Sequence, residues 1–236
     1  MPILRDCVIY YGDADLTATA NEFSVDSSFA DLDVTTFGSA GERQRIAGIE
    51  DATASVMTFG SPSIVEPEFS TKNGTVELLT VTQFPTSGGA TVGDRVYAMR
   101  GLLTSTKQPL KVGDVSKLDA MMATSQPEGL LCGQLLAAKQ TISATTTGTA
   151  ASFPGGLAAG QAAYFGVHVF SLTGDRTLSL KLQSTTVDRV TLPTFTAVGS
   201  GFGSSTTVTG HTNWRVVATL GGTTGTATFA AFCAIQ

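Results

Sequence analysis

The sequence predicts a mainly β protein, and three observations carry this prediction. Apolar and polar residues alternate along several segments, at the period of two that a half-buried strand requires. Thr, Ser, Gly and Ala dominate the chain, and Thr and Val favour strands. Glycine-bearing turns separate the segments at short intervals, which is typical of β-sandwiches. The chain has 236 residues, of which 42% are hydrophobic, so it can bury a sizeable core.

Two alternating strands are expected within residues 29–59. Apolar residues alternate with Asp31 and Asp33 in the first strand, and with Asp51 in the second strand. Alternation of this kind buries one face of a strand and leaves the other face in a polar setting. Residues 38–48 lie between the two strands and are rich in glycine and charge, so they predict a loop.

Residues 69–84 carry the sequence signal of a β-hairpin. Asn73 and Gly74 lie between the segments 69–72 and 75–84. An Asn-Gly pair supplies the positive φ angles that a tight two-residue turn requires. Further strands are expected at residues 6–11, 94–106 and 130–142.

One α-helix is expected, at residues 115–125, flanking the β structure. Asp114 fits the N-cap position, and Pro127 and Gly129 would end the helix. The apolar side chains of this segment fall at helical spacing and would form one stripe: Val115, Leu118, Met121 and Met122.

The C-terminal part predicts a second β region. Residues 147–160 are poor in charge and rich in Thr, Gly and Ala, which favours a linker. Strands are expected after it at residues 163–172, 177–184, 213–220 and 226–235, with a weaker one at 190–197. The glycines within 199–203 predict a hairpin turn. The expected organisation is a β domain at 1–146, a linker at 147–160 and a β-sandwich at 161–236.

The charge distribution argues against a protein that reads nucleic acid. The formal net charge is −5, and 17 of the 19 acidic residues lie within residues 1–149. Residues 150–236 hold two acidic and four basic side chains. The basic residues are spread singly, without interleaved aromatic residues, so no phosphate-binding surface is expected. An acidic surface repels phosphates and would let DNA pass without binding it.

The residue types that carry catalysis are sparse. Cys7, Cys132 and Cys233 sit among apolar neighbours and are expected to be buried thiols. His168 lies within an expected strand and His211 within a turn, and no nucleophile-elbow motif precedes either. No His or Cys pair has metal-ligand spacing. The sequence therefore predicts no enzyme, no cofactor, and no catalytic or metal-binding residues.

Two pairs of carboxylates leave an alternative open. Asp13 with Asp15, and Asp31 with Asp33, each share one face if they lie on strands, and such a pair could meet a calcium ion. Neither pair has the glycine and glutamate that complete a calcium loop, so solvated or subunit-contact carboxylates are favoured. The N-terminal segment lacks the features of a signal peptide, and no apolar run reaches the length of a membrane span. We therefore expect folding in the cytoplasm and no membrane partner.

One stretch resembles a known family. Residues 34–38 (VTTFG), an Arg-bearing connector and residues 47–51 (AGIED) are followed by Ser55 and Phe59 at matching positions. This succession resembles the major tail tube proteins of bacteriophages with long, non-contractile tails, and the match covers residues 29–59.

The resemblance implies a tail-tube-type β-sandwich or barrel with one flanking helix. It implies a structural, non-enzymatic virion protein of the phage tail, assembled in the host cytoplasm. Six copies would form a ring, and rings would stack, with other tail proteins, into a tube through which double-stranded DNA is ejected. Exposed strand edges invite pairing, and a ring closes them. Residues 161–236 could lie on the outside of the tube.

Several residues receive expected roles from this resemblance. The candidate lumen or inter-subunit carboxylates are Asp31, Asp33, Glu50 and Asp51. The candidate contact loop contains Glu42, Arg43 and Arg45. Residues 12–21 and 85–93 are candidate loops for contacts between rings. An alternative function is a capsid decoration protein, or a β-sandwich module that binds carbohydrate or a host surface. Such a module should present exposed aromatic residues, but the chain has a single tryptophan, Trp214, in an expected strand.

Overall fold

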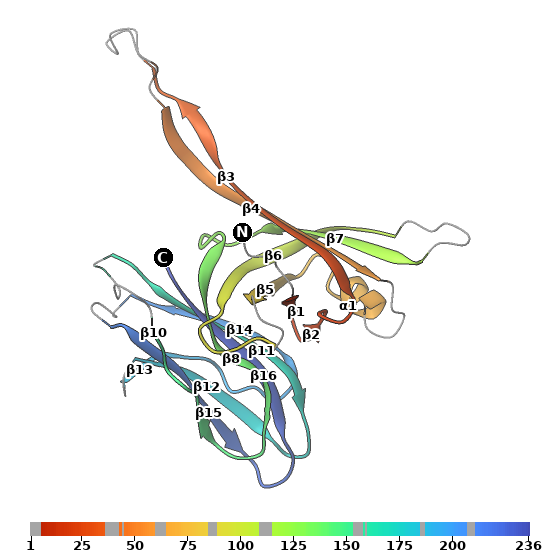
Figure 1. Ribbon diagram of the computed structural model, residues 1–236, viewed down its shortest axis with the longest axis vertical. Helices are drawn as coiled ribbons and strands as arrows, with labels where there is room; N and C mark the ends of the chain where they lie inside the picture. Colours follow the sequence, from red (N-terminus) through yellow and green to blue (C-terminus); the bar gives the residue numbers. More distant parts are fainter. Residues whose placement is uncertain are drawn as a thin grey trace. The chain divides into compact units, whose positions relative to one another are not determined.

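The protein is almost entirely β, as the sequence predicts (Figure 1). The computed structural model describes residues 6–35, 43, 45–59, 65–84, 89–108, 115–152, 158, 160–184, 187–206 and 211–236. Within these ranges it contains sixteen strands and one helix. No helix in the described ranges has the length and apolar character needed to cross a membrane.

The chain divides into two compact units, and neither is a continuous segment. Unit 1 comprises Met1–Ala18, Glu77–Met99 and Leu131–Gln236, and unit 2 comprises Thr19–Val76 and Arg100–Leu130. This division differs from the expected succession of two domains joined by a linker at 147–160. Strand β6 (Arg95–Lys107) contributes its first residues to unit 1 and its last residues to unit 2.

Unit 1 is a β-sandwich. Its first sheet has the strand order β14 (Gly199–Ser205), β11 (Ala163–Leu172), β16 (Ala227–Ile235), β8 (Leu131–Ile142), β6, β5 (Val76–Phe84), β1 (Asp6–Tyr11) and β2 (Ala14–Asp15). Its second sheet has the order β10 (Ala151–Ser152), β15 (Asn213–Gly221), β12 (Thr177–Ser184) and β13 (Val187–Thr191), and β9 (Thr146–Thr147) also pairs with β15.

The two sheets share one apolar core. Alternate residues of β12, and of β15 from Trp214 to Ala218, are buried, and Leu180 and Trp214 pack in the same cluster as Phe165 of β11 and Phe229 of β16. This alternation is what one core-facing side of each sheet requires.

Two segments expected to be loops belong to this sandwich instead. Strands β9 and β10 lie at the expected linker and pair with β15, because their backbone groups complete the edge of the second sheet. Leu16, in the loop expected at 12–21, is fully buried, and its N–H donates to the carbonyl of Ile9 at 2.9 Å. Burial of Leu16 holds this segment against β1.

Unit 2 is built on a four-stranded antiparallel sheet of order β3 (Ala20–Asp33), β4 (Arg45–Phe59), β7 (Lys117–Thr124) and the end of β6. One face of this sheet is buried. It carries small and apolar side chains together with one threonine: Ala52, Ala54, Val56, Thr58, Leu118, Ala120 and Met122. The helix α1 (Val65–Thr71) lies against β7 and buries Phe69.

The helix expected at 115–125 is wrong: residues 117–124 form strand β7. Its side chains alternate, with Leu118 and Met122 buried and Met121 49% exposed. Strand β7 pairs with β4 on one side and β6 on the other, so sheet pairing satisfies its backbone and overrides the helical spacing of the apolar residues. Asp114, the expected N-cap, lies outside the described residues.

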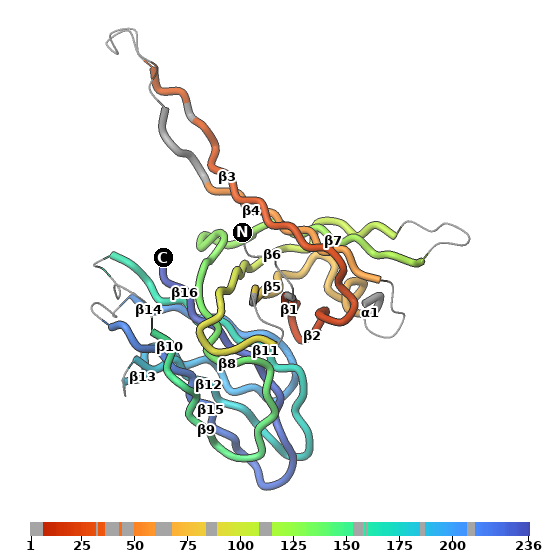
Figure 2. The backbone as a smooth tube through the Cα atoms, viewed as in Figure 1, coloured from red at the N-terminus to blue at the C-terminus, as the bar shows by residue number. Residues whose placement is uncertain are grey.

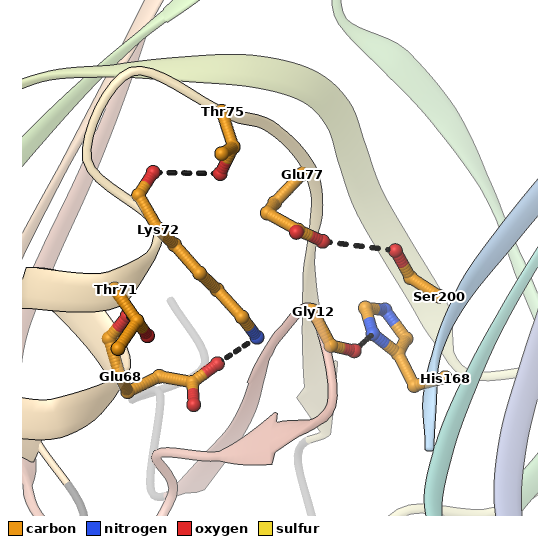
Figure 3. Close-up of polar contacts among 8 residues, drawn as sticks. All are labelled: Gly12, Glu68, Thr71, Lys72, Thr75, Glu77, His168 and Ser200. Carbon is orange, nitrogen blue, oxygen red and sulfur yellow. Dashed lines mark hydrogen bonds and ion pairs between the residues drawn. The ribbon is translucent and has the colours of Figure 1, made fainter. Parts of the chain in front are cut away.

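The hairpin expected at 69–84 is also wrong, although its turn is real. Gly74 has a φ of 79°, and the N–H of Thr75 donates to the carbonyl of Lys72 at 3.0 Å. The turn joins the helix α1 to β5 rather than two strands. Pro67 stands in the first turn of α1, where a missing N–H is tolerated. The residues after this proline can therefore be helical, and Lys72 forms an ion pair with Glu68 one turn earlier (Figure 3).

The turn expected at residues 199–203 is strand β14, which pairs with β11. Its glycines serve close packing. A Cβ atom at Gly203 would lie 2.7 Å from Val190, and one at Gly201 would lie 2.6 Å from Phe195. The segment that includes β13 therefore packs directly on the backbone of β14.

Candidate assembly surface

Among the described residues, the face of the unit 2 sheet opposite its core carries exposed or half-buried side chains. We call it the open face. Its side chains on β3 are exposed and mostly polar: Glu22, Ser24, Asp26 and Ser28. On β4, β7 and the end of β6 it continues through exposed or half-buried side chains: Asp51, Thr53, Ser55, Met57, Phe59, Lys117, Asp119, Met121, Ala123 and Lys107.

The strand register arranges these side chains in rows across the sheet. Ser24 pairs with Ser55, whose other neighbour is Met121, and the Ser24 and Ser55 hydroxyl oxygens lie 3.2 Å apart. The next row runs from Glu22 through Met57 to Asp119. Side chains that face one another in this way lie on the same side of the sheet.

Part of the open face is acidic. Glu22, Asp26 and Asp51 are exposed on β3 and β4, among the serine and threonine side chains of the same face. We call these three residues the acidic strip. No basic side chain stands between them in the rows of β3 and β4, so this region presents negative charge and hydroxyl groups to solvent.

The other end of the open face combines apolar and basic side chains around one acidic residue, Asp119. Phe59 is 42% exposed and Met121 is 49% exposed. Phe59 pairs with Lys117, and Lys107 lies in the row of Asp119. We call Phe59, Met121, Lys107 and Lys117 the apolar–basic patch. This patch could not be predicted from the sequence, because only the strand alternation of β7 brings Met121 and Lys117 to the same side as Phe59.

The hairpin formed by β3 and β4 extends beyond the rest of this sheet (Figures 1 and 2). Ala52 is fully buried, whereas the described side chains of residues 26–31 and 33–35 are all exposed. Phe29 is 59% exposed and Val34 is 39% exposed. We call this part the distal hairpin. An isolated two-stranded ribbon of this kind is marginally stable in water.

The four candidate carboxylates are divided between the two faces of the hairpin. Asp51 pairs with Ser28 and belongs to the open face, whereas Glu50 pairs with Phe29 and faces the other way. The register shift after Phe29 adds a residue to β4, so β3 keeps its alternation. Asp31 and Asp33 therefore share the face of Phe29.

Local contacts hold two of these carboxylates. Glu50 accepts a hydrogen bond from the Ser27 hydroxyl at 2.7 Å, and its Oε2 atom would lie 2.7 Å from a Cβ at Gly129. Asp33 accepts a hydrogen bond from the backbone N–H of Thr35 at 2.9 Å, and the Thr35 donors lower the pKa of the Asp33 carboxyl below its ordinary 3.8. Asp33 also pairs with Arg43 across 3.4 Å at an exposed position.

Only part of the candidate contact loop lies within the described residues. Glu42 lies outside the described residues, and Arg45 pairs with Asp33 through the backbone, its side chain lying outside the described part. Where the hairpin meets the sheet, Arg100 forms an ion pair with the buried Glu128 at 3.2 Å. This pair fixes the turn whose Gly129 packs on Glu50.

The remaining polar groups singled out in the sequence have structural partners. Asp15 pairs with Lys139 at 2.6 Å, so a lysine already engages one carboxylate of the Asp13–Asp15 pair. His168 is buried, with Nδ1 2.7 Å from the Gly12 carbonyl oxygen (Figure 3). Within the described residues, no group of three or more His, Cys, Asp or Glu side chains could hold a metal ion. Cys233 is buried as expected, whereas Cys132 is exposed.

Comparisons with known proteins establish no family. No family model and no curated protein matches the sequence. A solved chain described as the virion of a native gene transfer agent particle is 16% identical, with a TM-score of 0.42 over 53% of this chain and 94% of that chain. A chain of the sheath–tube complex of an extracellular contractile injection system is 12% identical, with a TM-score of 0.45 over 56% and 90%.

A third solved structure spans nearly the whole chain. The SPP1 Dit protein, described as a hub of the adsorption apparatus in phages that infect Gram-positive bacteria, is 11% identical, with a TM-score of 0.32 over 98% of this chain and 100% of that chain. All three scores lie below 0.5, so these likenesses assign no role to this chain.

Proposed function

We propose that this protein is a structural subunit of a phage tail, and that copies of it assemble into hexameric rings that stack into a tube for DNA. The observation that carries the proposal is the uncovered sheet of unit 2. Its open face is polar and partly acidic, and it adjoins a distal hairpin whose described β3 side chains are exposed on both faces. The resemblance of residues 29–59 to tail tube proteins falls on this hairpin and on the adjoining part of β4.

In the proposed tube, the acidic strip faces the bore. Glu22, Asp26 and Asp51 repel the DNA phosphates, and the neighbouring hydroxyl groups keep the wall hydrated. DNA then passes without specific binding. This role requires no catalytic residue and no cofactor, so the subunit is not an enzyme.

The other three candidate carboxylates receive a different role. Asp31, Asp33 and Glu50 lie on the opposite face of the distal hairpin from Asp51. A side chain there does not line the same surface as the acidic strip. We therefore assign these three to contacts between subunits, together with Arg43.

Strand β3 supplies a reason for association. Among the described residues it pairs only with β4, so its outer edge presents backbone donors and acceptors over fourteen residues. A long free edge pairs readily with another chain, and ring closure removes it.

Purified protein tests the proposal directly. Sedimentation velocity and negative-stain electron microscopy, over a range of concentrations and with a nucleating tail fraction, should show rings or tubes. A monomer that persists at every concentration and with the nucleating fraction would overturn the proposal.

A further inference from the structure

We propose that Asn73 is a site of spontaneous covalent modification, at which the side-chain amide converts to a carboxylate with loss of ammonia. Asn73 is followed by Gly74 in the turn between α1 and β5. Asparagine is among the thermally labile residues of proteins, and the attacking group is the backbone nitrogen of the residue that follows it. The inference concerns unit 2 alone and does not depend on the proposed assembly.

The tip of this turn is open to solvent. Asn73 and Gly74 are both exposed, and a Cβ atom at Gly74 would meet nothing within 4 Å. Among the described residues, neither the Asn73 side chain nor the N–H of Gly74 takes part in a hydrogen bond. The attacking nitrogen is therefore not held by a bond that would have to break first.

The residues on either side hold the turn closed around this tip. The carbonyl oxygen of Lys72 accepts from the Thr75 N–H at 3.0 Å and from the Thr75 hydroxyl at 2.6 Å (Figure 3). Gly74 has a φ of 79°, which glycine adopts without strain. Since glycine has no side chain, nothing on residue 74 obstructs the approach of its nitrogen to the Asn73 side chain.

The chemistry needs only water as a co-reactant. The Gly74 nitrogen loses its proton to solvent and attacks Cγ of Asn73, and the Cγ–Nδ2 bond breaks as the departing amide takes up a proton and leaves as ammonia. Water then opens the resulting cyclic imide. Attack at Cγ restores the backbone with an aspartate side chain, and attack at the backbone carbonyl carbon leaves an isoaspartate. Either product adds one negative charge to a chain whose formal net charge is −5.

The other two asparagines of the chain are internal controls. Asn21 and Asn213 are also exposed, but both lie in strands and are followed by Glu22 and Trp214 instead of glycine. Strand β15 pairs on both sides at Trp214, so the backbone that would attack Asn213 belongs to a buried ladder. Exposure is thus common to all three asparagines, whereas an open turn with a following glycine occurs only at Asn73.

The two products should affect the turn differently. An aspartate at position 73 keeps the backbone unchanged, and a charge at this exposed position changes stability little. An isoaspartate adds one backbone atom between Lys72 and Thr75, so the two hydrogen bonds that close the turn lose their geometry. The modification therefore acts on the connection between α1 and β5 as well as on charge.

Peptide mapping of the folded chain tests the site. Cleavage after lysine and arginine places the three asparagines in separate peptides. After incubation of the intact protein in mildly alkaline buffer, mass spectrometry should find conversion at Asn73 at least about tenfold faster than at Asn21 or Asn213, because a side chain on the following residue obstructs the attack. The rate should rise with pH, because the attacking nitrogen must lose its proton. Conversion at Asn73 that is no faster than at the other two residues would refute the inference.

Two matched variants separate this chemistry from other changes. Gly74→Asn keeps a residue type that tolerates positive φ but adds a side chain, and Asn73→Gln keeps the amide but lengthens the side chain. Hydroxylamine, which traps the cyclic imide by cutting the chain, should cleave the unaltered protein after residue 73 and leave both variants intact there. Asn73→Asp should coincide on ion exchange with the acidic form that accumulates, and should melt within a few degrees of the unaltered chain. A Gly74→Asn chain that converts at residue 73 as fast as the unaltered chain would overturn the proposal.

Discussion

The imidazole of His168 spans two segments of unit 1 by bonding Thr80 through Nε2 at 2.7 Å. Its Nδ1–H donates to the Gly12 carbonyl oxygen at the same distance, so Nε2 accepts from the Thr80 hydroxyl. Both ring nitrogens are thus satisfied in a buried position. The histidine joins β11 to β5 and to the turn after β1.

We expect His168→Leu to lower the free energy of unfolding by about 2–6 kcal/mol. The substitution leaves the Gly12 carbonyl and the Thr80 hydroxyl buried without this partner, at roughly 1–3 kcal/mol each. Urea denaturation measures the loss. Thr219→Ala, at an exposed position of β15, is the control and should change stability little. Equal stability of the His168 variant and the unaltered chain would contradict a structural role for this bond pair.

The Asp15–Lys139 pair should make stability fall in acid. Burial opposes ionisation of Asp15, but hydrogen bonds from Lys139 and Thr17 outweigh it and lower the pKa of this carboxyl below 3.8. A carboxyl with a lowered folded-state pKa stabilises the protein above its unfolded-state pKa, and this contribution is lost as the pH falls through the folded value.

The measurement is the difference in unfolding free energy between the unaltered chain and Asp15→Asn from pH 7 to pH 2. The gap should be constant above about pH 5 and close progressively below about pH 4. In Lys139→Gln, the free energy of unfolding should also fall less between about pH 4 and pH 2 than it does in the unaltered chain. A gap that persists unchanged at pH 2 would show that the pair does not contribute through ionisation.

Gly133→Ala should destabilise the sandwich by about 1–3 kcal/mol through overpacking. A Cβ at this position would overlap the carbonyl oxygen of Cys233 and lie 2.8 Å from the Cα of Ala234, and both are backbone atoms of β16 that cannot move aside cheaply. Thermal melting followed by circular dichroism measures the effect. Ser152→Ala, at an exposed position of β10, is the control. An unchanged melting temperature for the Gly133 variant would contradict the close approach of β8 and β16.

Reversing the charge of the acidic strip should make the bore of the proposed tube bind DNA. In the chain with Glu22→Lys, Asp26→Lys and Asp51→Lys, tubes should keep their length but retain DNA at low salt. Each lysine that contacts a phosphate adds about one to the slope of log affinity against log salt, so retention should disappear at high salt. Filter binding on assembled tubes measures this. Substituting the three residues with Gln is the control for lost charge alone, and tubes that bind no DNA after reversal would refute the bore assignment.

The fold class could be predicted because strand alternation is a local signal. Leu178 to Ser184 and Trp214 to Ala218 alternate between core and surface, and the sequence shows this directly. The segment 117–124 could not be assigned in the same way, since Leu118, Met121 and Met122 satisfy helical spacing and only pairing with β4 and β6 decides between the two. Strand β14 was predicted as a turn because glycines are common in turns. Its glycines instead make room for the side chains of Val190 and Phe195, a contact that the sequence does not show.

The candidate site could be predicted only as a stretch of sequence. Asp31, Asp33, Glu50 and Asp51 were candidates because they lie in the stretch that resembles tail tube proteins, but their division between two faces depends on the register shift after Phe29. No local sequence pattern predicts the extra residue of β4 at this register shift. Glu22 and Asp26 were not among the predicted site residues, because their strand begins nine residues before the alternation at residue 29.

Strand β16 has a consequence for the time at which this subunit becomes complete. It lies between β11 and β8 in the first sheet of unit 1, and its residues 227–235 are synthesised after both of these strands. Until then, β8 and β11 lack their shared neighbour, although both are already synthesised. Unit 2, whose residues all precede position 131, can fold earlier. The distal hairpin can therefore form before the sandwich of unit 1 has all its strands.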